Sequence, residues 1–175
     1  MSKIYHRVPE NMTGSILYPM NQMGTIDKDI YNLYKSGYKG REHLLDRKIP
    51  YLNCLWNDVL HCSPAHPQKI IDALKKAGVK NIPKFDYFEI DTNSDIDIKK
   101  AVIFYRNSDK FGDIRFEPAN QADWTKVDMI PQLTIDYFAQ VAKTNEPLFM
   151  YHGIPHFLYL GTIETKKLNI IKTSN

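Results

Sequence analysis

Polar side chains that could carry out chemistry gather in one segment of the chain, residues 49–67. There, strand-forming apolar residues are mixed with amide, carboxylate, thiol and imidazole groups: Asn53, Cys54, Asn57, Asp58, His61, Cys62 and His66. A plain core strand rarely carries so many polar groups, because each buried one needs a hydrogen-bond partner. Their density therefore predicts a site here, while the reaction stays open.

Two histidine pairs suggest metal chemistry, His61 with His66 and His152 with His156. Zinc accepts His nitrogen and Cys sulfur but needs three or four ligands at close range. Such spacings bring two imidazoles together mainly on a helix, and a proline interrupts each pair. We expect a turn at residues 153–155 and no bound metal.

The two cysteines, Cys54 and Cys62, offer nucleophilic catalysis as a further alternative. A nearby histidine would activate the thiol, and Asn57 or Asp58 would orient that histidine. Cys54, however, is typical of a small core residue. With only two cysteines no disulfide framework is indicated, which fits a reducing cytosol.

Length and composition indicate one globular domain spanning residues 1–175, with 43% hydrophobic and 12% aromatic residues. The net charge of +3 is too slight to indicate a nucleic-acid partner. The N-terminus lacks the apolar core of a signal peptide. The longest strongly apolar run, residues 101–105, falls far short of the ~20 residues that cross a bilayer. We therefore expect a cytoplasmic protein that makes no membrane contact.

Hydrophobic periodicity and punctuation by Pro and Gly predict the elements that must position these side chains. Helices are expected at residues 25–36, 41–47, 67–77 and 131–143. Strands are expected at residues 3–8, 51–56, 59–62, 84–91, 100–106, 113–117, 147–152, 156–160 and 168–172. Helices thus concentrate in the N-terminal half without regular alternation, which favours an α+β domain with a mostly antiparallel sheet.

The N-terminal segment resembles the opening of several small proteins of the ADP-ribosyltransferase-like superfamily. The resemblance lies in Tyr5-His6 at the end of a predicted strand, followed by Gly14-Ser15-Ile16-Leu17. It implies that His6 holds the nicotinamide-side ribose of NAD and that the first strand and residues 60–64 line one cleft. It also implies an aromatic residue under the nicotinamide and a glutamate on a late strand, for which Glu164 and Glu117 are candidates.

A larger part of the chain resembles a family of small bacterial proteins, some of them from bacilli. The shared runs are Tyr5-His6-Arg7-Val8-Pro9, Leu17-Tyr18-Pro19, Gly40-Arg41-Glu42-His43, residues 53–61 and Ile154-Pro155-His156. This resemblance implies no activity.

The leading hypothesis is an NAD- or nucleotide-handling enzyme of ADP-ribosyltransferase-like build. His6 and Asn57 would bind the cofactor, and Asp58 and His61 would be catalytic. Asp58 would stabilise the positive charge of an oxocarbenium-like transition state. The alternative from another class is a non-catalytic protein whose tyrosine-rich surface binds a protein partner. A cysteine- or metal-dependent hydrolase is a further alternative.

Overall fold

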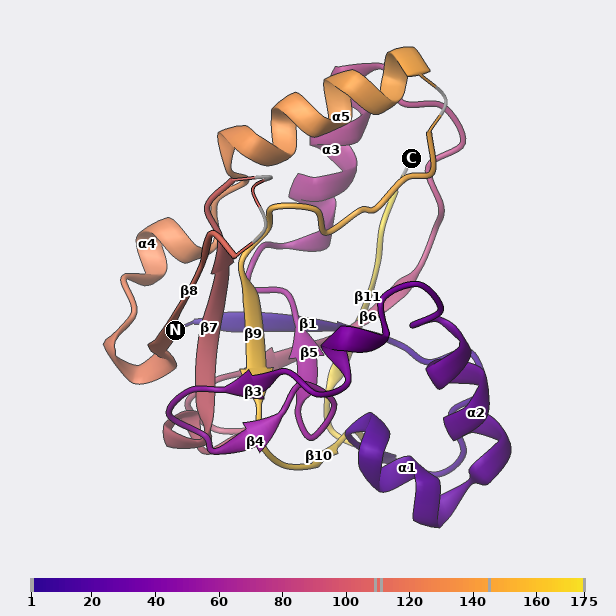
Figure 1. Ribbon diagram of the computed structural model, residues 1–175, viewed down its shortest axis with the longest axis vertical. Helices are drawn as coiled ribbons and strands as arrows, with labels where there is room; N and C mark the ends of the chain where they lie inside the picture. The colour runs from indigo at the N-terminus through magenta and orange to yellow at the C-terminus, as the bar shows by residue number, and fades with distance from the viewer. Residues whose placement is uncertain (1, 109, 111, 145, 175) are drawn as a thin grey trace.

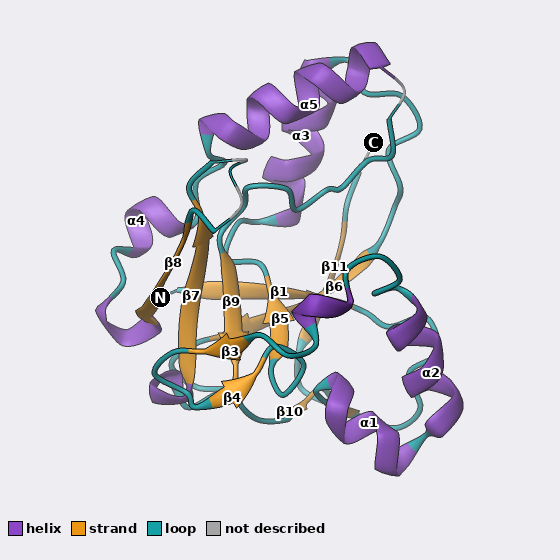
Figure 2. Ribbon diagram, viewed as in Figure 1, coloured by secondary structure: helices purple, strands orange, loops and turns teal. Residues whose placement is uncertain are grey.

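Two antiparallel sheets form the framework of the computed structural model, which describes residues 2–108, 110, 112–144 and 146–174 (Figures 1 and 2). The first sheet has the order β1-β6-β11 and the second β5-β9-β7-β8. The strands of the first are β1 (Lys3–Arg7), β6 (Asp86–Asp91) and β11 (Asn169–Lys172). Those of the second are β5 (Leu60–Cys62), β7 (Ala101–Arg106), β8 (Ile114–Pro118) and β9 (His156–Tyr159). The expected single α+β fold with antiparallel sheets is thus confirmed.

Strand β7 separates two hydrophobic clusters, because its alternate side chains point to opposite faces of the sheet. Ala101 and Ile103 belong to a cluster with Ile4 of β1. Val102 and Phe104 belong to another cluster, with Trp56. This double burial explains why β7 begins with an unbroken apolar run.

One isolated bridge joins the two sheets. Tyr5 of β1 and Ser63, just after β5, exchange two backbone hydrogen bonds of 2.8 Å. Figure 1 shows β1 running across the direction of β7 and β9. The edges of the two sheets therefore touch at this bridge and then diverge.

The expected helix at residues 67–77 is confirmed as α3 (Pro67–Ala77), and its local signals explain its bounds. The Nδ1 atom of His66 accepts a hydrogen bond from the Gln68 N–H at 3.1 Å, and Pro67 occupies the first turn. Gly78 ends the helix in the left-handed conformation at φ 83°. In Figure 1, α3 packs beside α5 (Gln132–Thr144), which confirms the helix expected at residues 131–143 with bounds one residue later.

The expected helix at residues 25–36 is wrong in two respects. It is divided into α1 (Met20–Ile26) and α2 (Lys28–Ser36), because the Asp27 carboxylate caps α2 by accepting from the N–H groups of Asp29 and Ile30. Neither helix has a buried residue, so the apolar face of α2 is not part of the core. Lys28 and Lys35 are exposed as expected, and so are Lys75 and Lys76 of α3.

The strand expected at residues 147–152 does not form. Side chains of α5 hydrogen-bond the backbone groups that a strand would pair: Tyr137 Oη donates to Pro147 O and accepts from Phe149 N, and Thr134 Oγ1 donates to His152 O. Residues 150–153 form a turn, which confirms that no helix links His152 to His156.

The remaining elements are short. The helix expected at residues 41–47 is reduced to a 3-10 turn (Glu42–Leu44), and two further turns of this kind follow (Ile98–Lys100 and Ala119–Gln121). Two ribbons pair β2 (Ile16–Leu17) with β10 (Ile163–Glu164), and β3 (Lys48–Ile49) with β4 (Cys54–Leu55). Helix α4 is Trp124–Val127. Among the described residues, no helix has the length and apolar character needed to span a membrane.

Candidate functional site

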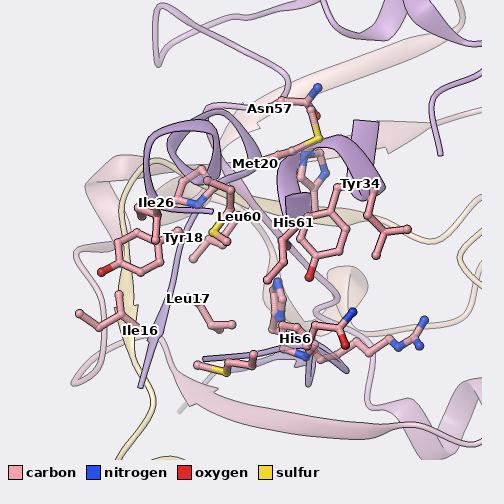
Figure 3. Close-up of a pocket in the computed structure, with 18 of the residues that line it drawn as sticks. His6, Ile16, Leu17, Tyr18, Met20, Ile26, Tyr34, Asn57, Leu60 and His61 are labelled. Atoms are coloured by element: carbon pink, nitrogen blue, oxygen red, sulfur yellow. Dashed lines mark hydrogen bonds between the residues drawn. The ribbon is translucent and has the colours of Figure 1, made fainter. Parts of the chain in front are cut away.

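A cavity of about 480 Å³ opens where the edges of the two sheets diverge. Beyond the Tyr5–Ser63 bridge, β1 continues into His6, while β5 runs back from Cys62 to His61. Residues of β2, α1 and α2 also line this space, which we call the histidine cavity (Figure 3). His6, Asn57 and His61, three of the four residues expected in one cleft, all line it.

His6 presents a neutral imidazole to the histidine cavity. Its Nδ1 lies 2.7 Å from the backbone oxygen of Arg7. Since a carbonyl oxygen only accepts, Nδ1 must carry the proton, which leaves Nε2 as an acceptor. Burial lowers the pKa of His6, so the neutral form prevails near pH 7.

His61 is likewise a neutral acceptor. Its Nε2 donates to the backbone oxygen of Trp56 at 2.8 Å, and its ring packs against the Trp56 indole with centroids 4.7 Å apart. Burial lowers the pKa of His61 to about 4; the His156 and His6 charges act in the same direction, and the hydrogen bond to Trp56 opposes them. Near pH 7 the ring therefore offers an unprotonated Nδ1 and carries no proton to give as a general acid.

Asn57 connects the sheet to the helices that line the histidine cavity. It is only 2% exposed. Its Oδ1 accepts from Tyr38 Oη at 2.6 Å, and its backbone oxygen accepts from Asn21 N at 3.0 Å. Its Nδ2 is buried and finds no acceptor among the described residues. Asn57 thus ties α1 and the segment after α2 to the turn that precedes β5.

Asp58 does not line the histidine cavity, which corrects its expected place in the cleft. Both of its carboxylate oxygens are engaged: Oδ2 accepts from Leu55 N at 2.7 Å and Oδ1 from Asn21 Nδ2 at 2.6 Å. An Asp that closes a turn through a backbone N–H is a common local arrangement, and it accounts for this residue. The Asp58 carboxylate is therefore explained by the turn between β4 and β5, whose backbone it hydrogen-bonds.

The rest of the histidine cavity is largely apolar and aromatic, with side chains from β2, α1, α2 and the segments around them. They include Ile16, Leu17, Tyr18, Met20, Met23, Ile26, Ile30, Leu33, Tyr34 and Tyr38. Helical periodicity predicted that the apolar row of α2 would lie in the core. Periodicity alone does not distinguish a core face from a cavity wall. The exposure of Ile26 (52%) and Leu33 (55%) reveals the difference.

Two carboxylates lie at or near the histidine cavity. Glu10 lines it and forms an ion pair with Arg7. Glu164 of β10 is paired directly with Ile16 of β2, so its side chain shares a face with a residue of the cavity wall. Glu117, in contrast, is on β8 and bonds Tyr105 and Arg115, away from this cavity.

The cysteines are poorly suited to nucleophilic chemistry. Burial raises the pKa of the Cys62 thiol, and burial with the nearby Asp58 charge raises that of Cys54. A nucleophilic cysteine needs the opposite shift. Within the described part of the chain, no three side chains of His, Cys, Asp or Glu are grouped as metal ligands.

Comparison with protein-family models, with curated proteins and with solved structures finds no match for this chain. The geometry of the cavities must therefore support any functional assignment.

Proposed function

We propose that the protein is a cytoplasmic NAD-handling enzyme of ADP-ribosyltransferase-like build, with the histidine cavity as its substrate site. The observation that carries this proposal is the pair of neutral imidazoles, His6 and His61, on the wall of one cavity. A sugar diol donates two hydroxyl protons, and two unprotonated ring nitrogens are suited to accept them. The volume of about 480 Å³ falls within the usual range of small-molecule sites.

Each residue has a role that follows from its chemistry. His6 accepts from a hydroxyl of the nicotinamide-side ribose, as the superfamily resemblance implies, and His61 accepts from a second polar group. The aromatic surface under the nicotinamide is one of the tyrosines that line the cavity, Tyr18, Tyr34 or Tyr38. Asn57 supports the cavity wall through its hydrogen bonds with Tyr38 Oη and Asn21 N.

The reaction breaks the glycosidic bond between C1′ of the ribose and the nicotinamide nitrogen. The bonding electrons move to the pyridinium ring, which leaves as neutral nicotinamide. A nucleophile, water or a hydroxyl-bearing acceptor, forms the new bond to C1′ and releases its proton to solvent. Glu10, the carboxylate that lines the cavity, replaces Asp58 as the group proposed to stabilise the oxocarbenium-like charge.

Isothermal titration with NAD and ADP-ribose tests the proposal. We expect His6→Asn to weaken binding of both by about tenfold, since one hydrogen bond to the ribose is lost. His66→Asn is the matched control, because asparagine keeps the cap of α3 and His66 does not line the cavity. Absence of NAD and ADP-ribose binding in the parent protein, or equal losses in the two variants, would contradict the proposal.

The alternative of a non-catalytic interaction protein is favoured by one observation, the exposed apolar side chains Ile26 and Leu33 on α1 and α2. Exposed apolar residues in a contiguous group mark many protein-binding surfaces. NAD distinguishes the two functions: a docking surface would leave NAD unbound and intact, whereas the proposed enzyme binds it and releases nicotinamide.

A further inference from the structure

A second cavity, of about 720 Å³, has Trp56 in its wall. Arg7 lines both this cavity and the histidine cavity, and the other lining residues differ. We call the second cavity the arginine cavity. Its basic side chains come from segments far apart in the sequence: Arg7, Arg41, Arg47, Arg106 and Lys110. No Asp or Glu is found among the described residues that line it, but Arg7 is already paired with Glu10, which lies outside this wall. Cations gathered in a concave wall favour an anionic ligand.

Among these side chains, Arg47 gives the strongest indication that the arginine cavity binds an anion. It is half-buried, and its guanidinium lies 5.4 Å from the ring centroid of Trp56. Within the described part of the chain, this guanidinium makes no ion pair and no hydrogen bond. Burial and the nearby Arg106 charge lower its pKa, as expected for a cation that lacks a compensating anion. A partly buried guanidinium without an acceptor is suited to bind phosphate oxygens with two parallel N–H groups.

The arginine cavity also offers an aromatic surface. Phe149 lines it and is 56% exposed, which is unusual for a phenylalanine. The loop that carries Phe149 is held in place, because the backbone N–H of Phe149 donates to Tyr137 Oη at 3.0 Å. An exposed ring on a fixed loop, in the same cavity as the guanidinium groups, provides a stacking surface for a nucleic-acid base.

We propose that the arginine cavity binds a nucleoside phosphate, with the phosphates on Arg47 and the neighbouring guanidiniums and the base on Phe149. The volume of about 720 Å³ lies within the range of small-molecule sites. Cations without an aromatic surface would fit inorganic phosphate equally well, and the exposed ring is what favours a base. This site does not depend on NAD chemistry in the histidine cavity.

Calorimetry on the full chain with ADP, pyrophosphate, adenosine and a 5′-phosphorylated single-stranded oligonucleotide tests the site. We expect ADP to bind more tightly than pyrophosphate, and adenosine to bind least. Arg47→Gln should weaken ADP binding by about tenfold or more. Phe149→Ala should weaken it by about fivefold or more and leave pyrophosphate unaffected. A different outcome is that the oligonucleotide binds more tightly than ADP and loses affinity in both Arg47→Gln and Phe149→Ala. That result would support the site and identify a nucleic-acid strand as the source of the nucleotide.

The matched control is Lys99→Gln, which removes one positive charge from an exposed residue before the start of β7, at the opposite end of the strand from Arg106. It should change ADP binding by less than about twofold. Equal losses in Lys99→Gln and Arg47→Gln would reduce the effect to general charge attraction and overturn the proposal. So would unchanged ADP binding in both Arg47→Gln and Phe149→Ala. If Arg47→Gln does not fold, the exposed Arg41→Gln takes its place.

The histidine variant separates this inference from the proposed function. His6→Asn should leave ADP binding to the arginine cavity unchanged, because His6 does not line it. Loss of ADP binding in His6→Asn would mean that both ligands occupy the histidine cavity, which would overturn the second site.

Discussion

At the scale of single residues, His61 links stability to pH. Its pKa is about 4 in the folded protein and about 6.5 as the ordinary value, so the unfolded chain takes up a proton first as pH falls. The contribution of His61 is therefore complete above pH 6.5 and is lost between about 6.5 and 4. We expect unfolding free energy, measured with urea, to fall by on the order of 3 kcal/mol over this window. His61→Gln should flatten the slope; parallel curves for parent and variant would contradict this cause.

Asp58 is a second residue whose role can be tested by one substitution. Asp58→Asn places an amide where the carboxylate now accepts from Leu55 N and Asn21 Nδ2. We expect a loss of about 1–2 kcal/mol in unfolding free energy, because one donor then lacks its acceptor, and little change in NAD affinity. Asp46→Asn, at an exposed position outside both cavities, is the control for the lost charge. Loss of NAD binding at unchanged stability would instead restore Asp58 to the site.

At the scale of elements, local signals and tertiary contacts explain different parts of the fold. The bounds of α3 could be predicted because Pro67 and Gly78 are local signals for the start and the end of a helix, and His66 caps its first turn. The strand expected at residues 147–152 was wrong because Tyr137, on another element, takes its backbone groups. Periodicity found the apolar row of α2, but only the tertiary structure shows that this row faces a cavity.

The α1–α2 pair should open independently of the sheets, since it has no buried residue. Asn57 and Asp58 hold α1 through Asn21, and Asn57 holds the segment after α2 through Tyr38. Tyr38→Phe removes the hydroxyl that bonds Asn57 Oδ1. We expect faster amide hydrogen exchange in α1 and α2, with a loss of about 1 kcal/mol in global stability. Tyr31→Phe, which removes a hydroxyl from α2 itself, is the control. Equal exchange in the two variants would show that Asn57 does not hold these helices.

At the scale of the whole molecule, both cavities combine residues that the sequence separates widely. His6 and His61 line one cavity because two sheet edges touch at one bridge, and residue spacing alone could not predict this arrangement. The arginine cavity could not be predicted, because Arg7, Arg47 and Arg106 lie on different segments and the net charge is only +3. The overall charge of a chain does not report how the fold distributes it.

Apolar residues should likewise divide between those that stabilise the fold and those that serve the histidine cavity. Leu158 is fully buried on β9 and Leu33 is 55% exposed on α2, so the same substitution compares the two. We expect Leu158→Ala to cost about 2–5 kcal/mol of unfolding free energy, because it leaves a void in a packed core. Leu33→Ala should change stability by less than about 0.5 kcal/mol and still weaken NAD binding, because Leu33 lines the cavity. Urea unfolding and calorimetry on both variants measure this division. Similar destabilisation by the two substitutions would show that α2 packs as part of the core and that the cavity is closed in solution.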